Sequence, residues 1–108
     1  MNISVYDILE SQNAVFHDDG LRVFTAVASD FKENEDEIQI SFEGIKVCTT
    51  QFLNASFGKL LLTFGEDVVR KRIHPVSYEG INAFLEKYEL VWENFQKKNK
   101  QFIEEAYA

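Results

Sequence analysis

The fold of this chain is decided in residues 37–65, which read EIQISFEGIKVCTTQFLNASFGKLLLTFG. Residues 38–42 alternate strictly between apolar and polar side chains, and a period of two is typical of a strand with one buried face. From residue 50 to residue 64 the apolar side chains recur every three or four positions, which predicts a helix. Thr49 or Thr50 can cap the start of that helix, and Gly65 can end it. The stretch therefore predicts a strand, a short connection and a helix.

Patterns on either side of this stretch complete an alternation of strands and helices. Short apolar runs predict strands at Ile3–Tyr6 and Ile73–Val76, the first at a sheet edge because it is so short. Pro75 favours an edge position for the second, since proline lacks the N–H that a neighbouring strand would need. Apolar residues at helical spacing predict further helices over 18–32, 66–72 and 77–95. This order favours one α/β domain over residues 1–108, with a mostly parallel sheet covered by helices.

The last helix raises a question of length. Its pattern begins after Ser77, a possible cap, and can continue through Phe102 and Ile103 for ~43 Å, which exceeds the ~26 Å diameter of a domain of this size. Its end must therefore fray, bend or meet a partner, and we expect Phe102, Ile103 and Tyr107 to pack on a second copy as a homodimer. The residues expected in the core are Phe24, Ala28, Ile38, Ile40, Phe42, Phe57, Leu61, Phe84 and Leu85.

Composition limits the possible partners. The chain has 108 residues, 45% of them hydrophobic, and a formal net charge of -7, which argues against nucleic acid and anionic membranes as partners. Arg70, Lys71 and Arg72 form the main local basic run, either a binding patch or the basic end of a helix. No apolar run approaches the ~20 residues of a membrane span, and the first residues lack the features of a signal peptide. The expected location is the cytoplasm.

The residue types that carry most enzyme chemistry are scarce. Cys48, the single cysteine, falls at a strand-to-helix turn where a helix N-terminus would lower a thiol pKa. Neither His17 nor His74 stands at a spacing that would make it a base for Cys48 or a metal ligand. The sequence also has no glycine-rich phosphate loop. The sequence therefore predicts no catalytic residue, no metal and no cofactor, and Cys48 is interpreted as a small apolar filler.

One polar cluster remains as a candidate site. Thr49, Thr50, Gln51 and Asn54 occupy the turn and first helical turn after a strand, where open α/β sheets expose their functional loops. A capping role alone also explains the two threonines.

The central part of the chain resembles a known family. Residues 38–45 look like the strand and Gly-Ile segment of STAS domains, and residues 49–60 resemble the STAS-like family of unknown function DUF4325. Residues 64–67 and 70–73 extend the similarity. The resemblance implies a small mixed sheet flanked by helices, related to the anti-anti-sigma factors.

The resemblance also implies a function. Anti-anti-sigma factors are not enzymes; they bind an anti-sigma-type kinase, and relatives of this subgroup are thought to pair with histidine-kinase-type ATPases. By position Thr50 matches their phosphoacceptor, while Thr49 stands where an aspartate is typical. We therefore expect a non-catalytic regulatory module that docks an ATPase or kinase through Thr49, Thr50, Gln51 and Asn54. The alternative is a domain that binds a small ligand or a nucleotide, as some STAS relatives do.

Overall fold

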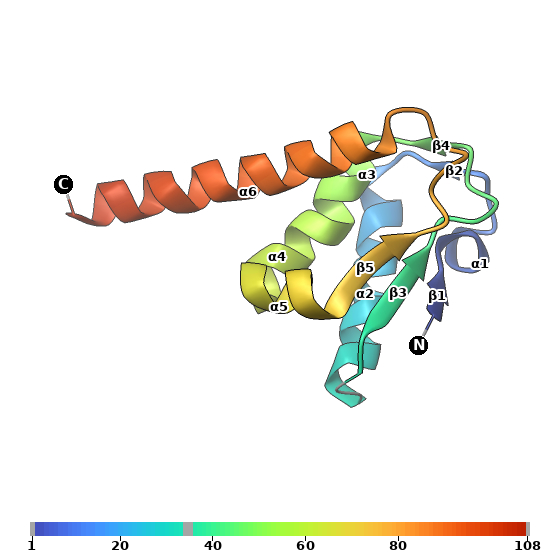
Figure 1. Ribbon diagram of the computed structural model, residues 1–108, viewed down its shortest axis with the longest axis horizontal. Helices are drawn as coiled ribbons and strands as arrows, with labels where there is room; N and C mark the ends of the chain where they lie inside the picture. The colour runs from blue at the N-terminus through green and yellow to red at the C-terminus, as the bar shows by residue number, and fades with distance from the viewer. Residues whose placement is uncertain (1, 34–35, 108) are drawn as a thin grey trace.

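The computed structural model describes the backbone of residues 2–33 and 36–107 and the side chains of residues 2–31 and 36–98. These residues form small parallel sheets packed against helices, with a long helix last in the chain (Figure 1), which confirms the predicted α/β class. In chain order the elements are β1 (Asn2–Ser4), α1 (Val5–Leu9), β2 (Asn13–Ala14), α2 (His17–Glu33), β3 (Ile38–Ser41), β4 (Val47–Cys48), α3 (Thr50–Leu53), the π-helix η1 (Asn54–Gly58), α4 (Lys59–Phe64), α5 (Glu66–Arg72), β5 (Ile73–Val76) and α6 (Phe84–Tyr107).

The main sheet has three strands in the order β1-β3-β5, and both pairings are parallel. The two outer strands are those predicted to lie at edges. The Phe42 N–H donates to the Val76 carbonyl at 3.0 Å, so the Val76 backbone faces β3. The backbone N–H and C=O groups of successive strand residues point to opposite sides. The Pro75 nitrogen, which has no N–H, therefore faces the open edge of the sheet, where no strand needs a donor.

The first strand is shorter than the predicted Ile3–Tyr6. It ends at Ser4, whose side-chain oxygen accepts a hydrogen bond from the Asp7 N–H at 3.1 Å and caps α1. Val5 and Tyr6 are therefore helical, because the capping serine turns the backbone out of the sheet.

A second, two-stranded parallel sheet pairs β2 with β4. Each strand has only two residues, too short for a period to show in the sequence. Its register sets Ala14 beside Cys48, both buried, and Asn13 beside Val47, both exposed. The connection between β3 and α3 thus carries a strand of its own.

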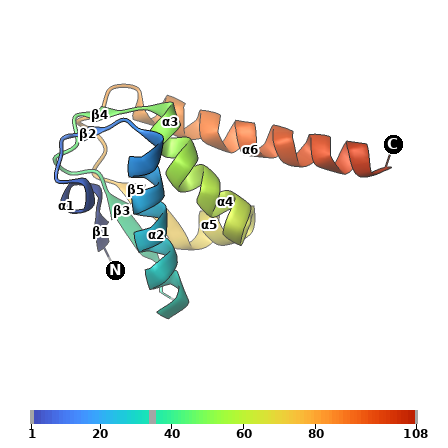
Figure 2. The ribbon, with the colours of Figure 1, turned by 180° about the vertical axis from the view of Figure 1, so that it is seen from behind.

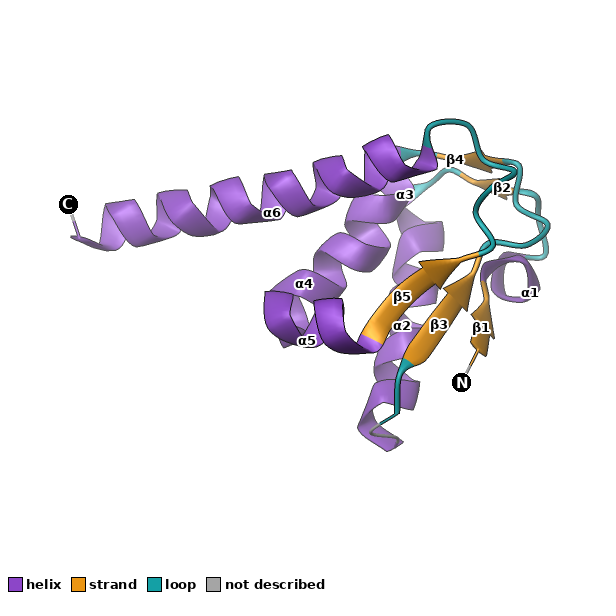
Figure 3. Cartoon of the chain, viewed as in Figure 1, coloured by secondary structure: helices purple, strands orange, loops and turns teal. Residues whose placement is uncertain are grey.

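One face of the main sheet is covered by helices. Ile38 and Ile40 are fully buried while Gln39 between them is exposed, as the period of two predicts. Helices α2 and α3 to α4 lie on this covered face (Figures 1 and 2), and Figure 3 shows the strands in front of α2. At the centre Phe42 packs against the rings of Phe52, Phe57 and Phe84, with Phe84 nearest at 4.8 Å between centroids.

Helix α2 confirms the predicted extent, but its buried face is shifted by one residue from the predicted one. Gly20, Val23 and Val27 are buried, whereas Phe24 and Ala28 are only partly buried. A Cβ placed on Gly20 would lie 2.5 Å from the Phe52 carbonyl oxygen, so α2 crosses the segment after β4 at very close range. Only a residue without a side chain fits in so close a crossing.

Helix α6 begins at Phe84, seven residues after the expected cap Ser77. Ser77 and Ala83 have φ values of 56°, and a left-handed residue at each end of this segment cannot continue a right-handed helix. Ile81 is buried from the loop instead. Leu85, expected in the core, is 50% exposed because the helix turns Phe84 inward in its place.

No helix in the described part of the chain combines the length and the apolarity that crossing a bilayer would require. Helix α6 runs on past α4 and α5 with no other element beside its far half (Figures 1 and 2). The side chains of Phe102, Ile103 and Tyr107, expected to pack on a second copy, lie outside the described ones.

Candidate functional site

The two threonines of the predicted site have different surroundings. Thr49 is the N-cap of α3, with an extended backbone at φ -99° and ψ 158°. Its hydroxyl accepts from the Phe52 N–H at 3.1 Å and donates to the Val15 carbonyl at 2.6 Å. Its own N–H donates to the Ala14 carbonyl at 3.0 Å. Thr49 therefore ties the end of β2 to the start of α3.

Thr50, the first residue of α3, is partly exposed, and its hydroxyl has no hydrogen-bond partner among the described residues. Gln51 and Asn54 are exposed on the same helical start, with Asn54 about one turn beyond Thr50. The structure thus brings the four predicted residues together at one corner. Capping accounts for Thr49 and leaves the Thr50 hydroxyl unused.

The helix that carries these residues contains a π-helical turn, η1, which sequence patterns did not reveal. Ser56 within it is fully buried, and its hydroxyl donates to the Phe52 carbonyl at 2.9 Å. A π turn leaves backbone carbonyls without their usual partners, and a buried serine can satisfy one of them. The sequence feature that relates to this turn is Gly20, because its missing side chain lets α2 approach Phe52 and Ala55 there.

Cys48 is buried beside this turn, and burial raises the pKa of its thiol to about 12, although the charge of Lys87 acts in the opposite direction. Desolvation therefore outweighs any effect of the helix start, and the thiolate that a nucleophile needs is disfavoured. Lys87 reaches across from α6 and donates to the Cys48 carbonyl at 2.9 Å. The two residues are 39 positions apart, and the sequence held no sign of this contact.

The two histidines lie on different elements. His17 begins α2 and is exposed, while His74 on β5 lies 3.1 Å from the Lys71 carbonyl and 3.8 Å from Glu37. Among the residues that the structure describes, no three His, Cys, Asp or Glu side chains gather where they could hold a metal ion.

Arg70, Lys71 and Arg72 form the last turn of helix α5, which agrees with their interpretation as the basic end of a helix. Arg70 donates to Glu66 at 2.9 Å and lies over the Trp92 ring at 5.0 Å. Arg72 lies over the Phe31 ring at 3.9 Å and donates to the Asp36 carbonyl at 3.3 Å. Both arginines thus make contacts within the domain.

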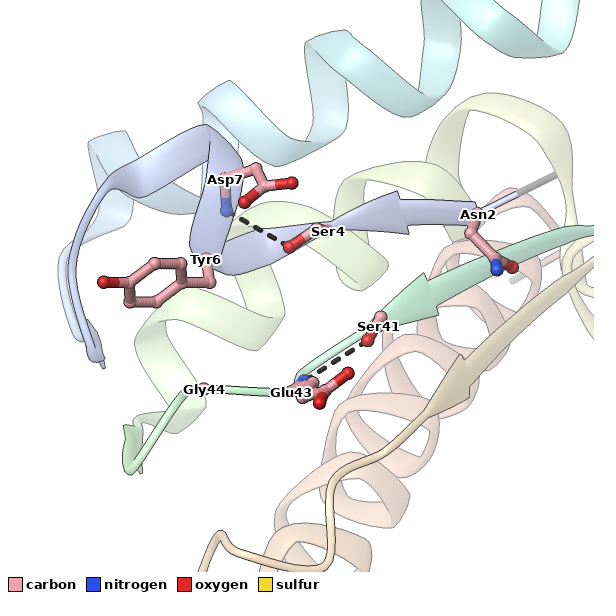
Figure 4. Close-up of a pocket in the computed structure, with 7 residues that line it drawn as sticks. All are labelled: Asn2, Ser4, Tyr6, Asp7, Ser41, Glu43 and Gly44. Atoms are coloured by element: carbon pink, nitrogen blue, oxygen red, sulfur yellow. Dashed lines mark hydrogen bonds between the residues drawn. The ribbon is translucent and has the colours of Figure 1, made fainter.

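A polar cavity of about 540 Å³ lies at the carboxyl ends of β1 and β3 (Figure 4). Ser4 and Ser41 stand side by side in the sheet register, and Ser41 accepts from the Glu43 N–H at 3.3 Å as Ser4 does from Asp7. The cavity is lined by Asn2, Ser4, Tyr6, Asp7, Ser41, Glu43 and Gly44. This lining holds two carboxylates and no lysine or arginine, which suits a cation better than a phosphate.

Two exposed apolar side chains flank the predicted site. Phe16, 67% exposed, directly follows Val15, whose carbonyl accepts from Thr49. Val47, 46% exposed, stands two residues before Thr49 on the outer face of the small sheet. We call Phe16, Val47, Thr50, Gln51 and Asn54 the corner surface. Exposed apolar residues beside polar ones often mark a binding surface.

Comparison with known proteins gives one match. The model of the STAS-like domain of unknown function (DUF4325) matches residues 19–81, which run from the first turn of α2 to the loop after β5. No curated protein and no solved structure matches the chain. The matched part holds β3, β5 and the whole helix that carries Thr50, and it covers more than half of the chain. The chain therefore belongs to the STAS-like family of domains of unknown function, DUF4325.

Proposed function

We propose that this chain is a non-catalytic regulatory module that docks a protein partner through the corner surface. The observation that carries the proposal is the difference between the two threonines. Both residues are partly exposed, but Thr49 uses its hydroxyl twice inside the domain, whereas the Thr50 hydroxyl has no partner in the described part of the chain. A polar group left free next to exposed apolar side chains is available for an intermolecular contact.

Phe16 supplies the main apolar contact of this surface. Its ring is 67% exposed, and aromatic side chains dominate the binding energy of many protein interfaces. Val47 adds a second apolar contact, and Gln51 and Asn54 contribute polar groups at the rim. The partner that family resemblance suggests is an ATPase of the histidine-kinase type or an anti-sigma-like kinase.

Phosphorylation of Thr50 is the proposed switch. It would add a charge of about -1.5 to -2 at neutral pH on a partly exposed residue. Docking would bring that charge against the apolar contact made by Phe16 and Val47, and desolvation of a phosphate there is costly. Unmodified Thr50 therefore supports docking, and phosphorylated Thr50 opposes it.

The test measures binding of the purified partner, first identified by affinity purification from the native host, to variants of the corner surface. We expect Phe16→Ala and Thr50→Glu to weaken binding at least about tenfold, and Thr50→Ala, which removes one hydroxyl contact but adds no charge, to weaken it by less than that. The matched controls are Thr63→Glu, an exposed helical threonine on α4, and Leu90→Ala, an exposed leucine on α6. Equal affinity of all variants, each with a normal fold, would reject the corner surface as the docking site.

The cavity of Figure 4 favours a second candidate function, binding of a small ligand. Asp7 and Glu43 are exposed and have no ion-pair partner among the described residues. The ligand class they suit is an amine or guanidinium compound, because a cation would neutralise both carboxylates. A nucleotide, the other ligand expected for STAS relatives, would bring its phosphates toward them.

A further inference from the structure

A groove beside α6 meets the corner surface at Asn54 and extends from there along α4 and α6, whose residues the proposed function does not use. It has a volume of about 140 Å³ and is lined by Asn54, Gly58, Leu62, Phe95 and Lys98. Leu62 is 71% exposed, the highest exposed fraction among the large apolar residues of the described chain. Phe95 is partly buried against the core, so the groove has an apolar floor and a lysine at its rim.

Helix α6 itself is only half covered by the domain. Its first half is held there: Val91 is buried, and Tyr88 packs against the rings of Phe57 and Trp92. Its backbone then continues to Tyr107 and leaves the body, as Figures 1 and 2 show from two sides. A short helix without packing is marginal in water, so a partner beside its far half would stabilise it.

The sequence of α6 carries two opposite charge blocks. Lys97, Lys98 and Lys100 form a basic block, and Glu104 and Glu105 form an acidic one. Two copies running parallel would place like blocks side by side. Two antiparallel copies related by a twofold axis near Gln101 would instead place Lys98 opposite Glu104 and Lys97 opposite Glu105.

We propose that the chain forms a symmetric homodimer in which the end of α6 of one copy lies antiparallel to α6 of the other and reaches its groove. The apolar floor at Leu62 and Phe95 receives the last turns, where the sequence has Ile103 and Tyr107. Lys98 at the rim meets the acidic block of the second copy. Because the contact is the same in both directions, the dimer closes and does not extend.

Sedimentation equilibrium of the full chain tests this dimer. We expect the wild type to dimerise and Leu62→Asp to raise the dissociation constant at least about tenfold. Leu62 is largely exposed, so the variant keeps its fold, which circular dichroism verifies. Thr63→Asp is the control, since it adds the same charge one residue away on a side chain that does not line the groove.

The charge pairing has its own test. Lys98→Glu should weaken the dimer, and Lys98→Glu combined with Glu104→Lys should restore it, because the pair is then reversed. A monomeric wild type, an undiminished dimer in Leu62→Asp, or a failure of the double exchange to restore the dimer would each overturn the proposal.

Discussion

At the scale of the residue, Gly20 and Gly58 are two helical glycines with different neighbours. A Cβ on Gly20 would lie 2.5 Å from the Phe52 carbonyl oxygen and 2.6 Å from the Ala55 Cβ. A Cβ on Gly58 would meet Val91 at 3.7 Å, an ordinary contact. The close packing of the domain therefore depends on Gly20, which the sequence patterns did not single out.

Gly20→Ala should lower the free energy of unfolding by about 1–3 kcal/mol, because α2 must move away from the π turn to make room. Gly58→Ala should leave it unchanged or raise it by up to about 1 kcal/mol, since alanine is the better helix former. Urea unfolding of both variants measures the difference. A Gly20→Ala protein as stable as the wild type would contradict the crossing geometry.

Substitutions of Thr49 and Thr50 should have different effects on the free energy of unfolding, because only Thr49 makes hydrogen bonds through its hydroxyl. Thr49→Ala removes the cap of α3 and the bond to the Val15 carbonyl, and should lower the free energy of unfolding by about 1–3 kcal/mol. Thr50→Ala removes no hydrogen bond and should stay within about 0.5 kcal/mol. Thr49→Ser, which keeps the hydroxyl, is the control and should lose less than Thr49→Ala.

Cys48 should make the free energy of unfolding fall as the pH rises through the alkaline range. Folding raises the pKa of its thiol from 9.0 to about 12, so between these values the unfolded chain has lost a proton that the folded chain retains. This contribution is complete below pH 9.0 and is lost as the pH rises toward about 12. The pKa of Tyr88 is also raised by burial, so the measured quantity is the difference between the wild type and Cys48→Ala over this range. A difference independent of pH would argue against a buried thiol.

At the scale of the element, β3 leads directly into the aromatic centre of the core. Phe42, just beyond its end, contacts the rings of Phe52, Phe57 and Phe84, which come from three different helical segments. Phe42→Ala should lower the free energy of unfolding by about 3–5 kcal/mol. Leu85→Ala, at a position that is 50% exposed, should change it by no more than about 0.5 kcal/mol. Thermal and urea unfolding check both, and a loss below about 1 kcal/mol for Phe42→Ala would conflict with its burial.

Elements with a clear period could be predicted from the sequence, and those set by long-range packing could not. The strand at 38–42 and the helix at 18–32 were identified because several residues repeat one pattern. The β2–β4 pair could not be predicted, because strands of two residues show no period. The predicted start of α6 is too early, because Ile81 and Phe84 have helical spacing although a loop separates them. For the site, the sequence identified the turn, but the difference between Thr49 and Thr50 depends on Val15, a residue 34 positions away.

At the scale of the whole molecule, binding partners can be distinguished by charge. The chain carries a formal net charge of -7, and the cavity at the carboxyl ends of β1 and β3 adds Asp7 and Glu43 without a lysine or arginine in its lining. Nucleotide phosphates are bound in proteins by basic side chains and by helix starts that point into the site. The lining of this cavity has no basic side chain. The helix start in it, that of α1, has its Asp7 N–H bonded to the Ser4 hydroxyl and carries the Asp7 carboxylate, which would repel a phosphate.

We therefore expect ATP and GTP to give no binding heat in calorimetric titration, and an arginine-containing ligand to give weak, salt-sensitive binding that the double variant Asp7→Asn, Glu43→Gln abolishes. The substitutions keep the size of both side chains and remove only their charge, so loss of binding would report electrostatics rather than shape. Asp67→Asn, an exposed acidic residue on α5 outside the cavity, is the matched control. Saturable nucleotide binding that survives in the double variant would place a ligand elsewhere and favour a nucleotide-binding function over the docking module.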